Sequence, residues 1–445
     1  MHLTRTDSVT VERHAETQTR RIFGPVLLVR VVIRNLAMED NNDELLDEQN
    51  EAVEAQVSLP QDIQQTALAF LPGRVVFKLR AVCRFWRDCI QVPSFVDRHL
   101  NNALCFHQSI AFFTSVDDGL FCMYTFDPTT LNRKSLDFVL SFRFQMSDPC
   151  NGLVCAYDSR GAVEVLNPLT MKHVILPVSE LQSRALSSEY FLGSVQSKNE
   201  YKVVCIRHRV RFLTFEVCTV GTQLWRAVRE SANLLKTSKA VIVNDVMHWL
   251  LLDAASDFTR RILLFNLTDE IFSETAVPDT IKDHNLELFE GEGKLHLLAM
   301  PTKGSASEVS EIWVSNSTCT VWDHMCNITF LLPPGMRPHF LHKKKLFYGN
   351  QKRFYYIDLE GGGGSYINVP SDETIVSSGI FVDSLLLHSV TGLVDSRTLL
   401  MGSDYAGSSS HAAGSSSSDA GQSFKEAKSN RKMKWRLTRI SAKKT

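Results

Sequence analysis

A polar turn recurs six times between residues 127 and 361 of this 445-residue chain, and a short apolar run follows most of the copies. The copies begin at Asp127, Asn167, Gly221, Asn266, Asn316 and Asp358, with spacings of 40, 54, 45, 50 and 42 residues. One four-stranded blade of a β-propeller takes roughly 40 to 50 residues. The spacing therefore predicts an all-β domain of about six blades.

Apolar runs between turn residues fill the segment from Leu104 to Val390, and we expect them to be β-strands. The clearest runs are residues 152–158, 201–207, 245–253, 294–300 and 345–350. Closing a propeller into a ring protects its sheet edges. We expect a last strand, Gly379–Leu387, to pair with the first blade, so that truncation after Pro370 causes aggregation or loss of cooperative unfolding. A partly open assembly of two sheets is the alternative.

The segment Leu59–Leu100 has a different pattern, with apolar residues at the spacing of an α-helix. Five of them recur at steps of three, four, three and four residues: Val76, Leu79, Cys83, Trp86 and Ile90. Pro72-Gly73 separates this helix from a shorter one, and Pro93 ends it. About 42 residues is close to the lower limit for an independent core. Two such helices should bury one face on each other and present the other to a partner protein.

The ordered motif in this segment resembles an F-box. The matching residues that we assign to adaptor binding are Leu59, Pro60, Ile63, Leu71, Pro72, Leu79, Val82 and Trp86. Ala67 departs from the family, which usually has a larger aliphatic residue there, and removes some contact area. The resemblance implies docking on a Skp-type adaptor, which bridges to a cullin. Some of the eight residues would contact the adaptor, and the others would hold the helices together.

The region from about Asn102 to His388 resembles the F-box-associated, degenerate kelch domain of plant F-box proteins. Its landmarks are Cys150–Cys155, Leu166–Thr170, Tyr201–Val204, Val243-Asn244 and His248-Trp249. The double-glycine signature of well-formed kelch repeats is absent.

The implied fold class is α+β multidomain, with a small all-α F-box followed by an all-β kelch-like propeller of about six blades and with disordered termini. We place a disordered N-terminal extension at residues 1–56 and the F-box at residues 57–100. The propeller covers residues 101–392. A disordered tail, Ser/Gly-rich and then basic, covers residues 393–445.

The two resemblances together imply the substrate-recognition subunit of a Skp–cullin–F-box ubiquitin ligase. The F-box would dock on the adaptor, and the propeller would bind an unknown target protein and lead to its ubiquitination and degradation. Two alternatives stay open. The chain could be an F-box interaction protein acting outside a cullin complex, or a propeller enzyme.

No combination of residues in the sequence indicates catalysis, so we expect no catalytic residue, cofactor or metal. Gly361–Gly364 lacks the Gly-Lys-Ser/Thr of a phosphate-binding loop and is expected to be a hairpin turn. Arg207, Arg209 and Arg211 alternate along a strand and are expected on a solvated sheet edge, with contact to an acidic substrate or phosphate as the alternative. His248 lies in an apolar strand and is expected to be buried or half-exposed rather than bound to metal.

The formal net charge of −1 gives no field that would attract nucleic acid or a membrane surface, so we expect neither as a partner. Ten cysteines without a Cys-x-x-Cys pair indicate free thiols in a reducing compartment, the cytoplasm or the nucleus. Residues 1–37 are poor in acids and could form a transit peptide, unless Met38 is the initiator. The basic stretch Lys425–Lys444 indicates a solvated tail or a nuclear import signal.

Overall fold

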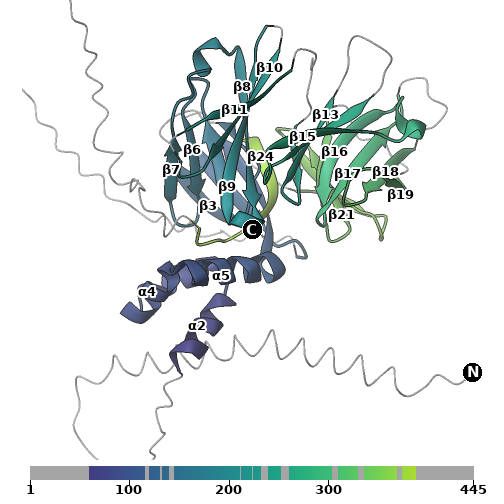
Figure 1. The fold of residues 1–445 in the computed structure, drawn as a ribbon. Helices are drawn as coiled ribbons and strands as arrows, with labels where there is room; N and C mark the ends of the chain where they lie inside the picture. The colour runs from purple at the N-terminus through teal and green to yellow at the C-terminus, as the bar shows by residue number, and fades with distance from the viewer. Residues whose placement is uncertain are drawn as a thin grey trace, which may run out of the picture. The chain divides into compact units, whose positions relative to one another are not determined.

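The computed structural model describes residues 60–386, except for residues 116–119, 131–132, 140–144, 211, 223, 232–238, 252–259, 303–308, 329–334 and 368–372. The predictions for residues 1–56 and 393–445, and for Leu59 and Arg211, fall outside the described residues. Within the described part, a short helical region precedes a mostly β region (Figure 1). None of the helices described is both long enough and apolar enough to cross a bilayer.

The helical region contains α2 (Gln61–Ala69), α3 (Gly73–Leu79), α4 (Arg84–Gln91) and α5 (Pro93–Phe106). The single helix predicted over the stripe from Val76 to Ile90 was wrong, because a turn divides it into α3 and α4. Cys83 begins α4 by accepting a hydrogen bond from the Trp86 backbone N–H through its sulfur. Pro93 does not simply end a helix, since it opens α5 at the first position, where a missing N–H is tolerated.

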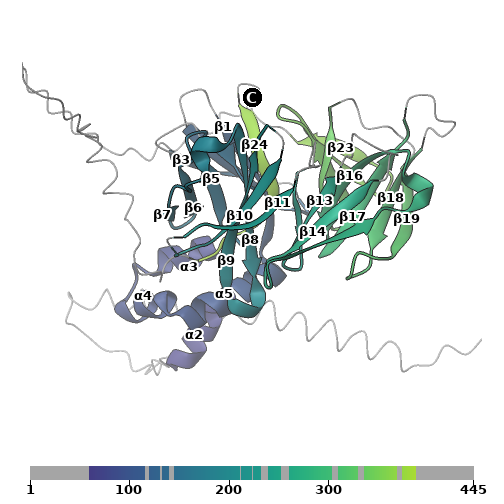
Figure 2. The ribbon, with the colours of Figure 1, turned by 45° about the horizontal axis from the view of Figure 1, so that its top comes forward.

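The β region begins with four separate antiparallel sheets of four strands each (Figures 1 and 2). The first contains β24 (Thr374–Val382), β1 (Gln108–Ser115), β2 (Leu120–Phe126) and β3 (Arg133–Val139). The second contains β4 (Gln145–Met146), β5 (Val154–Tyr157), β6 (Val163–Asn167) and β7 (Lys172–Leu176). The third contains β8 (Ser187–Val195), β9 (Glu200–His208), β10 (Leu213–Thr219) and β11 (Arg226–Ser231). The fourth contains β12 (Val241–Val243), β13 (Val246–Leu251), β14 (Arg261–Asn266) and β15 (Ile271–Ala276).

The remaining strands form one sheet of eight strands. One half contains β16 (Asn285–Gly291), β17 (Lys294–Met300), β18 (Ser310–Ser315) and β19 (Trp322–Ile328). The other half contains β20 (Arg337–His342), β21 (Lys345–Gly349), β22 (Phe354–Asp358) and β23 (Gly364–Ile367). A short parallel pairing of Glu290 with Phe340 and of Gly291 with Leu341 joins the halves. The predicted order, a helical region followed by a β-propeller region, is confirmed.

The recurring polar turn has the same place in every group of four strands, where it joins the third strand to the fourth. In five copies the side-chain oxygen of the first residue accepts hydrogen bonds from two later backbone N–H groups. These residues are Asp127, Asn167, Asn266, Asn316 and Asp358. Asp and Asn favour such turns because their short side chains replace a backbone acceptor. The repeat read from the sequence is therefore a repeated structural connection.

The five clearest predicted strands are confirmed, and each is the second strand of its group: β5, β9, β13, β17 and β21. The glycine run Gly361–Gly364 leads from β22 into β23, as the predicted hairpin turn requires. The ten cysteines are free thiols.

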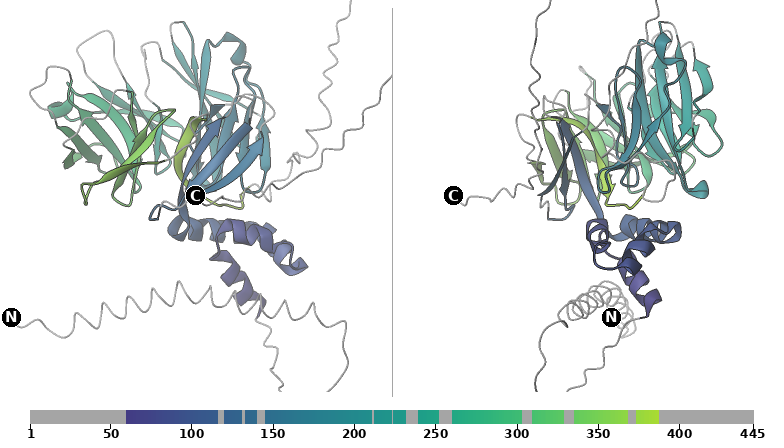
Figure 3. Two further views of the ribbon diagram at one scale, coloured as in Figure 1. Left: turned by 180° about the vertical axis from the view of Figure 1, so that it is seen from behind. Right: turned by 90° about the vertical axis from the view of Figure 1, so that its left-hand side faces the viewer.

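The last strand pairs with the first sheet, as predicted, although it begins and ends earlier than expected. β24 covers Thr374–Val382 and pairs antiparallel with β1 (Figure 3). Glu373, just before this strand, is buried and accepts hydrogen bonds from the hydroxyls of Thr114 and Tyr124. A carboxylate buried in this way needs its donors, so Glu373 links the start of β24 to β1 and β2.

Candidate functional site

The helical region has a filled apolar core, centred on Trp86. The Trp86 side chain is 1% exposed, and its Nε1 donates a hydrogen bond of 2.8 Å to Gln64 Oε1 on α2. Leu71 and Leu79 are also buried. These three predicted site residues therefore hold the helices together, because their side chains are not available to a partner.

The other described residues of the predicted adaptor site lie at the surface. Ile63 is 40% exposed and Val82 is 49% exposed, and Pro60 and Pro72 are exposed as well. Val75 on α3 is exposed to a similar degree and was not predicted. The structure thus separates the described residues of the predicted set into an exposed group and a core group, a division that periodicity alone could not make.

Ala67, the departure from the family pattern, is buried rather than exposed. The expectation that its small side chain reduces a contact surface was therefore wrong. Ala67 lies in the core cluster with Leu68 and Ala69. A small residue there changes the packing inside the helical region and leaves the exposed group unaltered.

Side chains of α5 and of the residue after it form hydrogen bonds with three consecutive carbonyl oxygens, at the last residue of α2 and the two residues that follow. Asn102 Nδ2 donates to Ala69 O at 3.0 Å, and His107 and His99 contact Phe70 O at 2.7 Å and Leu71 O at 3.0 Å through Nε2. The last carbonyls of a helix lack partners within it, so α5 satisfies them and orients α2. Sequence analysis missed this function, because nothing in the spacing of these residues indicates their acceptors.

A segment after the last strand holds the helical region against the β region. Arg74 on α3 forms an ion pair of 2.8 Å with Asp383, and a Cβ added to Gly73 would clash with the Asp383 carbonyl. One residue further, Ser384 O accepts a hydrogen bond of 2.9 Å from Asn167 Nδ2. Leu385 lies in the apolar cluster that also contains core residues of the helices. The exposed group on the helices is thereby fixed relative to the sheets.

The β region encloses a cavity of about 1470 Å³, which includes residues of β4, β8, β12, β16, β20 and β24 in its lining. Two ion pairs lie in this lining, since Lys239 Nζ lies 2.6 Å from Asp148 Oδ1 and Arg337 Nε lies 3.6 Å from Glu287 Oε1. Burial lowers the pKa of His339 to about 3, so this imidazole is neutral at pH 7. The lining thus combines two ion pairs with a neutral imidazole.

Burial favours the neutral form of two ionisable groups that line the cavity, Cys150 and Glu290. Cys150 lines the cavity, and burial raises the pKa of its thiol to about 11, so it stays protonated and is a weak nucleophile at pH 7. Burial also raises the pKa of Glu290. Across the described residues, no three His, Cys, Asp or Glu side chains gather as metal ligands.

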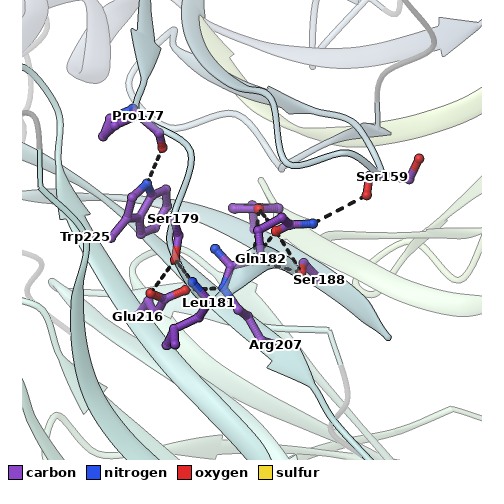
Figure 4. A network of polar contacts seen from close by, with 10 residues as sticks. Ser159, Pro177, Ser179, Leu181, Gln182, Ser188, Arg207, Glu216 and Trp225 are labelled. Atoms are coloured by element: carbon purple, nitrogen blue, oxygen red, sulfur yellow. Dashed lines mark hydrogen bonds and ion pairs between the residues drawn. The ribbon is translucent and has the colours of Figure 1, made fainter. Parts of the chain in front are cut away.

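The placement of Arg207 on a solvated sheet edge was wrong. β9 is an interior strand between β8 and β10, and the Arg207 side chain is buried in an ion pair with Glu216 (Figure 4). Its Nη1 also donates to Gln182 Oε1 and to Ser188 Oγ. Glu216 on the next strand offsets part of the cost of burying this charge, and the sequence gives no sign of that pairing.

His248 is buried, as expected, between β12 and the turn before β19. Its Nδ1 contacts Val241 O at 3.2 Å and its Nε2 lies 3.4 Å from Cys319 Sγ. Burial lowers the pKa of His248 to about 4 and raises that of the Cys319 thiol. The two groups therefore meet as a neutral imidazole and a neutral thiol inside the core.

Models of known protein families match both the helical region and the β region. A family model described as "F-box associated beta propeller domain" matches residues 103–349, and one described as "F-box domain" matches residues 57–98. The chain belongs to the F-box-associated β-propeller family. Within this family the helical region is the F-box, which implies binding of a Skp-type adaptor. Members of the F-box-associated propeller family are typically not catalysts.

Similar F-box proteins occur in Arabidopsis thaliana. F-box protein At5g49610 is 25% identical over 308 residues, which covers 63% of this chain and 81% of that protein. F-box protein At3g07870 is 24% identical over 305 residues, covering 58% and 71%. F-box/kelch-repeat protein At3g23880 is 23% identical over 245 residues, covering 50% and 66%.

Two solved structures show weak similarity to this chain, with TM-scores below 0.5. TolB from Acinetobacter baumannii has a TM-score of 0.41 at 10% identity, covering 67% of this chain and 73% of that chain. An oligogalacturonate lyase in complex with manganese has a TM-score of 0.39 at 9% identity, covering 58% and 77%. Scores at this level support no conclusion about activity.

Proposed function

We propose that this chain is the substrate-recognition subunit of a Skp–cullin–F-box ubiquitin ligase. One observation supports the proposal most directly. Ile63 and Val75 on the helices, and Val82 in the turn between α3 and α4, are exposed around a core that Leu79 and Trp86 already fill. Exposed apolar side chains on a well-packed scaffold are the kind of surface that a partner protein buries. A Skp-type adaptor is the partner that the F-box motif indicates.

The proposed mechanism is proximity. The F-box holds the chain on the adaptor and, through it, on the cullin, while the propeller holds a target protein for ubiquitination and degradation. Tethering raises the effective concentration of the target near the conjugating enzyme. The chain itself is proposed to be non-catalytic, without cofactor or metal, and to act in the cytoplasm, the nucleus or both.

Two architectural proposals accompany this function. We propose that the eight-stranded sheet is two blades that share a short parallel contact, which gives six blades with β24 as the innermost strand of the first. We also propose the F-box at residues 57–100 and the propeller at residues 101–392. If these limits are right, a chain that starts at residue 101 should unfold in a single transition. It would lose only the contacts that Asp383 makes with the F-box.

The adaptor assignment is tested by co-precipitation of a purified Skp-type adaptor with full-length variants. Ile63→Asp and Val82→Asp should each reduce retained adaptor at least tenfold, because each places a charge in the proposed contact. Leu59→Ala combined with Pro60→Ala should also reduce it. Leu224→Asp is the matched control, since Leu224 is an exposed apolar residue of the β region.

Full adaptor retention by the Asp variants would contradict the assignment, provided that their urea unfolding matches the wild type. Cullin co-purification with the adaptor then separates a ubiquitin ligase subunit from an F-box protein that acts outside a cullin complex.

A further inference from the structure

The turn between α3 and α4 (Figure 2) lies in a stretch with a surplus of basic residues. Residues 75–92 include a single acidic residue, Asp88, and four basic ones: Lys78, Arg80, Arg84 and Arg87. Three of the four are exposed, and Arg80 is half-buried. The same turn carries Val82, which is more exposed than either Ile63 or Val75. A positive charge thus accompanies the apolar surface that we assign to the adaptor.

Arg84 stands at a position that disfavours a positive charge. It is the first residue of α4, and the first turn of this helix contains no acidic residue. The positive end of the helix dipole repels a cation there. Arg84 forms no ion pair within the described part of the chain, although Asp88 lies one turn later in α4. The stability of α4 therefore gives no reason for an arginine at this position.

Arg87 extends back from α4 to the same turn. Its Nε donates a hydrogen bond of 3.3 Å to Arg80 O, which orients the guanidinium. The two Nη groups of Arg87 have no hydrogen-bond partner among the described residues. A hollow of about 310 Å³ is lined by Arg80, Ala81, Arg87 and Gln91. Since Ala81 precedes Val82 directly, this hollow adjoins the proposed adaptor contact.

Arg80 is restrained from the other side, by an aromatic ring. Its guanidinium carbon lies 3.6 Å from the centre of the Phe77 ring, within the range of a cation–π contact. Two residues that line the hollow, Arg80 and Arg87, therefore carry guanidiniums that are already oriented before a partner binds. Such groups suit a carboxylate, because they donate two parallel N–H bonds and lose little conformational entropy. The chemistry that fits this surface is an acidic side chain.

We propose that Arg80, Arg84 and Arg87, named here the arginine rim, bind acidic side chains of the Skp-type adaptor beside the apolar contact at Val82. One carboxylate enters the hollow and pairs with Arg87, and another pairs with Arg84. This inference rests on the proposed function, because it assigns the charge chemistry of the same adaptor surface. Complementary charges at the edge of an interface mainly accelerate association and make it depend on salt.

The test measures the association and dissociation rate constants of the full chain with a purified Skp-type adaptor, by biolayer interferometry at 50 and 300 mM NaCl. Association of the wild type should be at least tenfold slower at the higher salt concentration. The double variant Arg84→Glu/Arg87→Glu should associate at least tenfold more slowly at 50 mM NaCl and should lose that salt dependence. Its dissociation rate should change less than threefold. Val82→Asp, in contrast, should mainly increase the dissociation rate.

Three further variants separate the charge effect from other causes. Arg353→Glu is the matched control for each single substitution, because Arg353 is exposed in the β region and the net charge changes equally. Arg84→Glu places a carboxylate in the first turn of α4, where the helix dipole favours it, so urea unfolding should show no loss of stability. An adaptor variant with one acidic residue changed to Lys should restore fast association to Arg87→Glu.

Unchanged association rates of the Glu variants, or an equal effect of Arg353→Glu, would overturn the arginine rim. Loss of binding by Ile63→Asp in the same assay would then still support the adaptor assignment, so the two failures are distinct. A wild type that binds the adaptor at neither salt concentration would contradict both proposals. If the double variant loses binding to a single-stranded RNA oligonucleotide but associates normally with the adaptor, the rim binds nucleic acid instead.

Discussion

Arg74 Nε lies 2.8 Å from Asp383 Oδ2, although the two residues are 309 positions apart in the chain. The contact joins the F-box to the segment after the last strand, where Gly73 also approaches the Asp383 backbone. Both side chains are largely buried. In the proposed complex, the orientation of the F-box relative to the β region would therefore depend on a few residues near the two ends of the described region.

Removal of this contact should loosen the F-box from the β region. We expect Asp383→Ala to lower the free energy of unfolding by about 1.5–3 kcal/mol, the usual range for hydrogen bonds to charged groups. Urea unfolding followed by circular dichroism measures the change. Lys344→Ala is the control, because Lys344 and Glu360 form an exposed pair at 3.5 Å that should contribute little. Equal effects of the two changes would contradict the role of Asp383.

The core of the F-box should depend on Trp86 far more than on the exposed group. We expect Trp86→Ala to destabilise the protein by about 3–5 kcal/mol, because it leaves a cavity and removes the hydrogen bond to Gln64. Val82→Ala should change stability by less than about 0.5 kcal/mol, as for most surface substitutions. Denaturant unfolding of both variants checks this, and a large effect of Val82→Ala would show that Val82 belongs to the core.

The buried ion pair in the third sheet gives a prediction with an internal control. Arg207→Met leaves Glu216 buried without its cation, so we expect a loss of about 3–5 kcal/mol. Adding Glu216→Leu removes the uncompensated charge and should recover part of that loss. Thermal unfolding of the single and double variants measures the difference. If the double variant is less stable than the single one, the penalty does not come from the unpaired carboxylate.

Stability should fall in mild acid because several histidines are buried and neutral. Burial lowers the pKa of His99 from 6.5 to about 4, so between these values the unfolded chain binds a proton that the folded chain excludes. Protonation of His99 therefore costs no stability above about pH 6.5. The free energy of unfolding decreases as the pH falls from about 6.5 to about 4, and below pH 4 this residue causes no further change. The pKa difference corresponds to roughly 3 kcal/mol at most.

The variant His99→Gln separates this residue from the other buried histidines. Glutamine can still donate a hydrogen bond to Leu71 O but does not titrate. Denaturant unfolding at pH 7 and at pH 4.5 should show a smaller difference for the variant than for the wild type. An unchanged difference would mean that His99 is not the group responsible.

Truncation after Pro370 should abolish cooperative folding of the β region. It removes β24, so the edge of β1 loses its partner, and it removes Glu373, so the hydroxyls of Thr114 and Tyr124 lose their acceptor. Size-exclusion chromatography should show aggregates. A chain that ends at residue 392 retains β24 and should remain monodisperse with a single unfolding transition.

Local features were predictable from the sequence. The turns at Asp127 and Asn167 could be placed because the oxygen of an Asp or Asn side chain and the N–H groups that it accepts are only a few residues apart. The spacing of apolar residues predicted that Trp86 lies in a core and that His248 lies in a strand. In each case the interacting groups are close in the chain, or burial alone decides the outcome.

Features that depend on distant partners could not be predicted in the same way. An arginine such as Arg207 is predicted to lie at the surface, because the sequence does not show that Glu216 and Gln182 lie beside it. The three carbonyl acceptors at Ala69, Phe70 and Leu71 give no sign that α5 and the residue after it contact them. The contact of Arg74 with Asp383 joins two residues 309 positions apart, and no local pattern anticipates it.

The pairing of β24 with β1 also has a consequence for the time course of synthesis. Thr114 leaves the ribosome 259 residues before Glu373, its hydrogen-bond acceptor in the finished protein. At about 5–20 residues per second, that interval lasts roughly 13 to 50 seconds. During it the apolar strand β1 has one unpaired edge, and such an edge can pair with another chain, so we expect the nascent chain to depend on a chaperone until β24 has been synthesised.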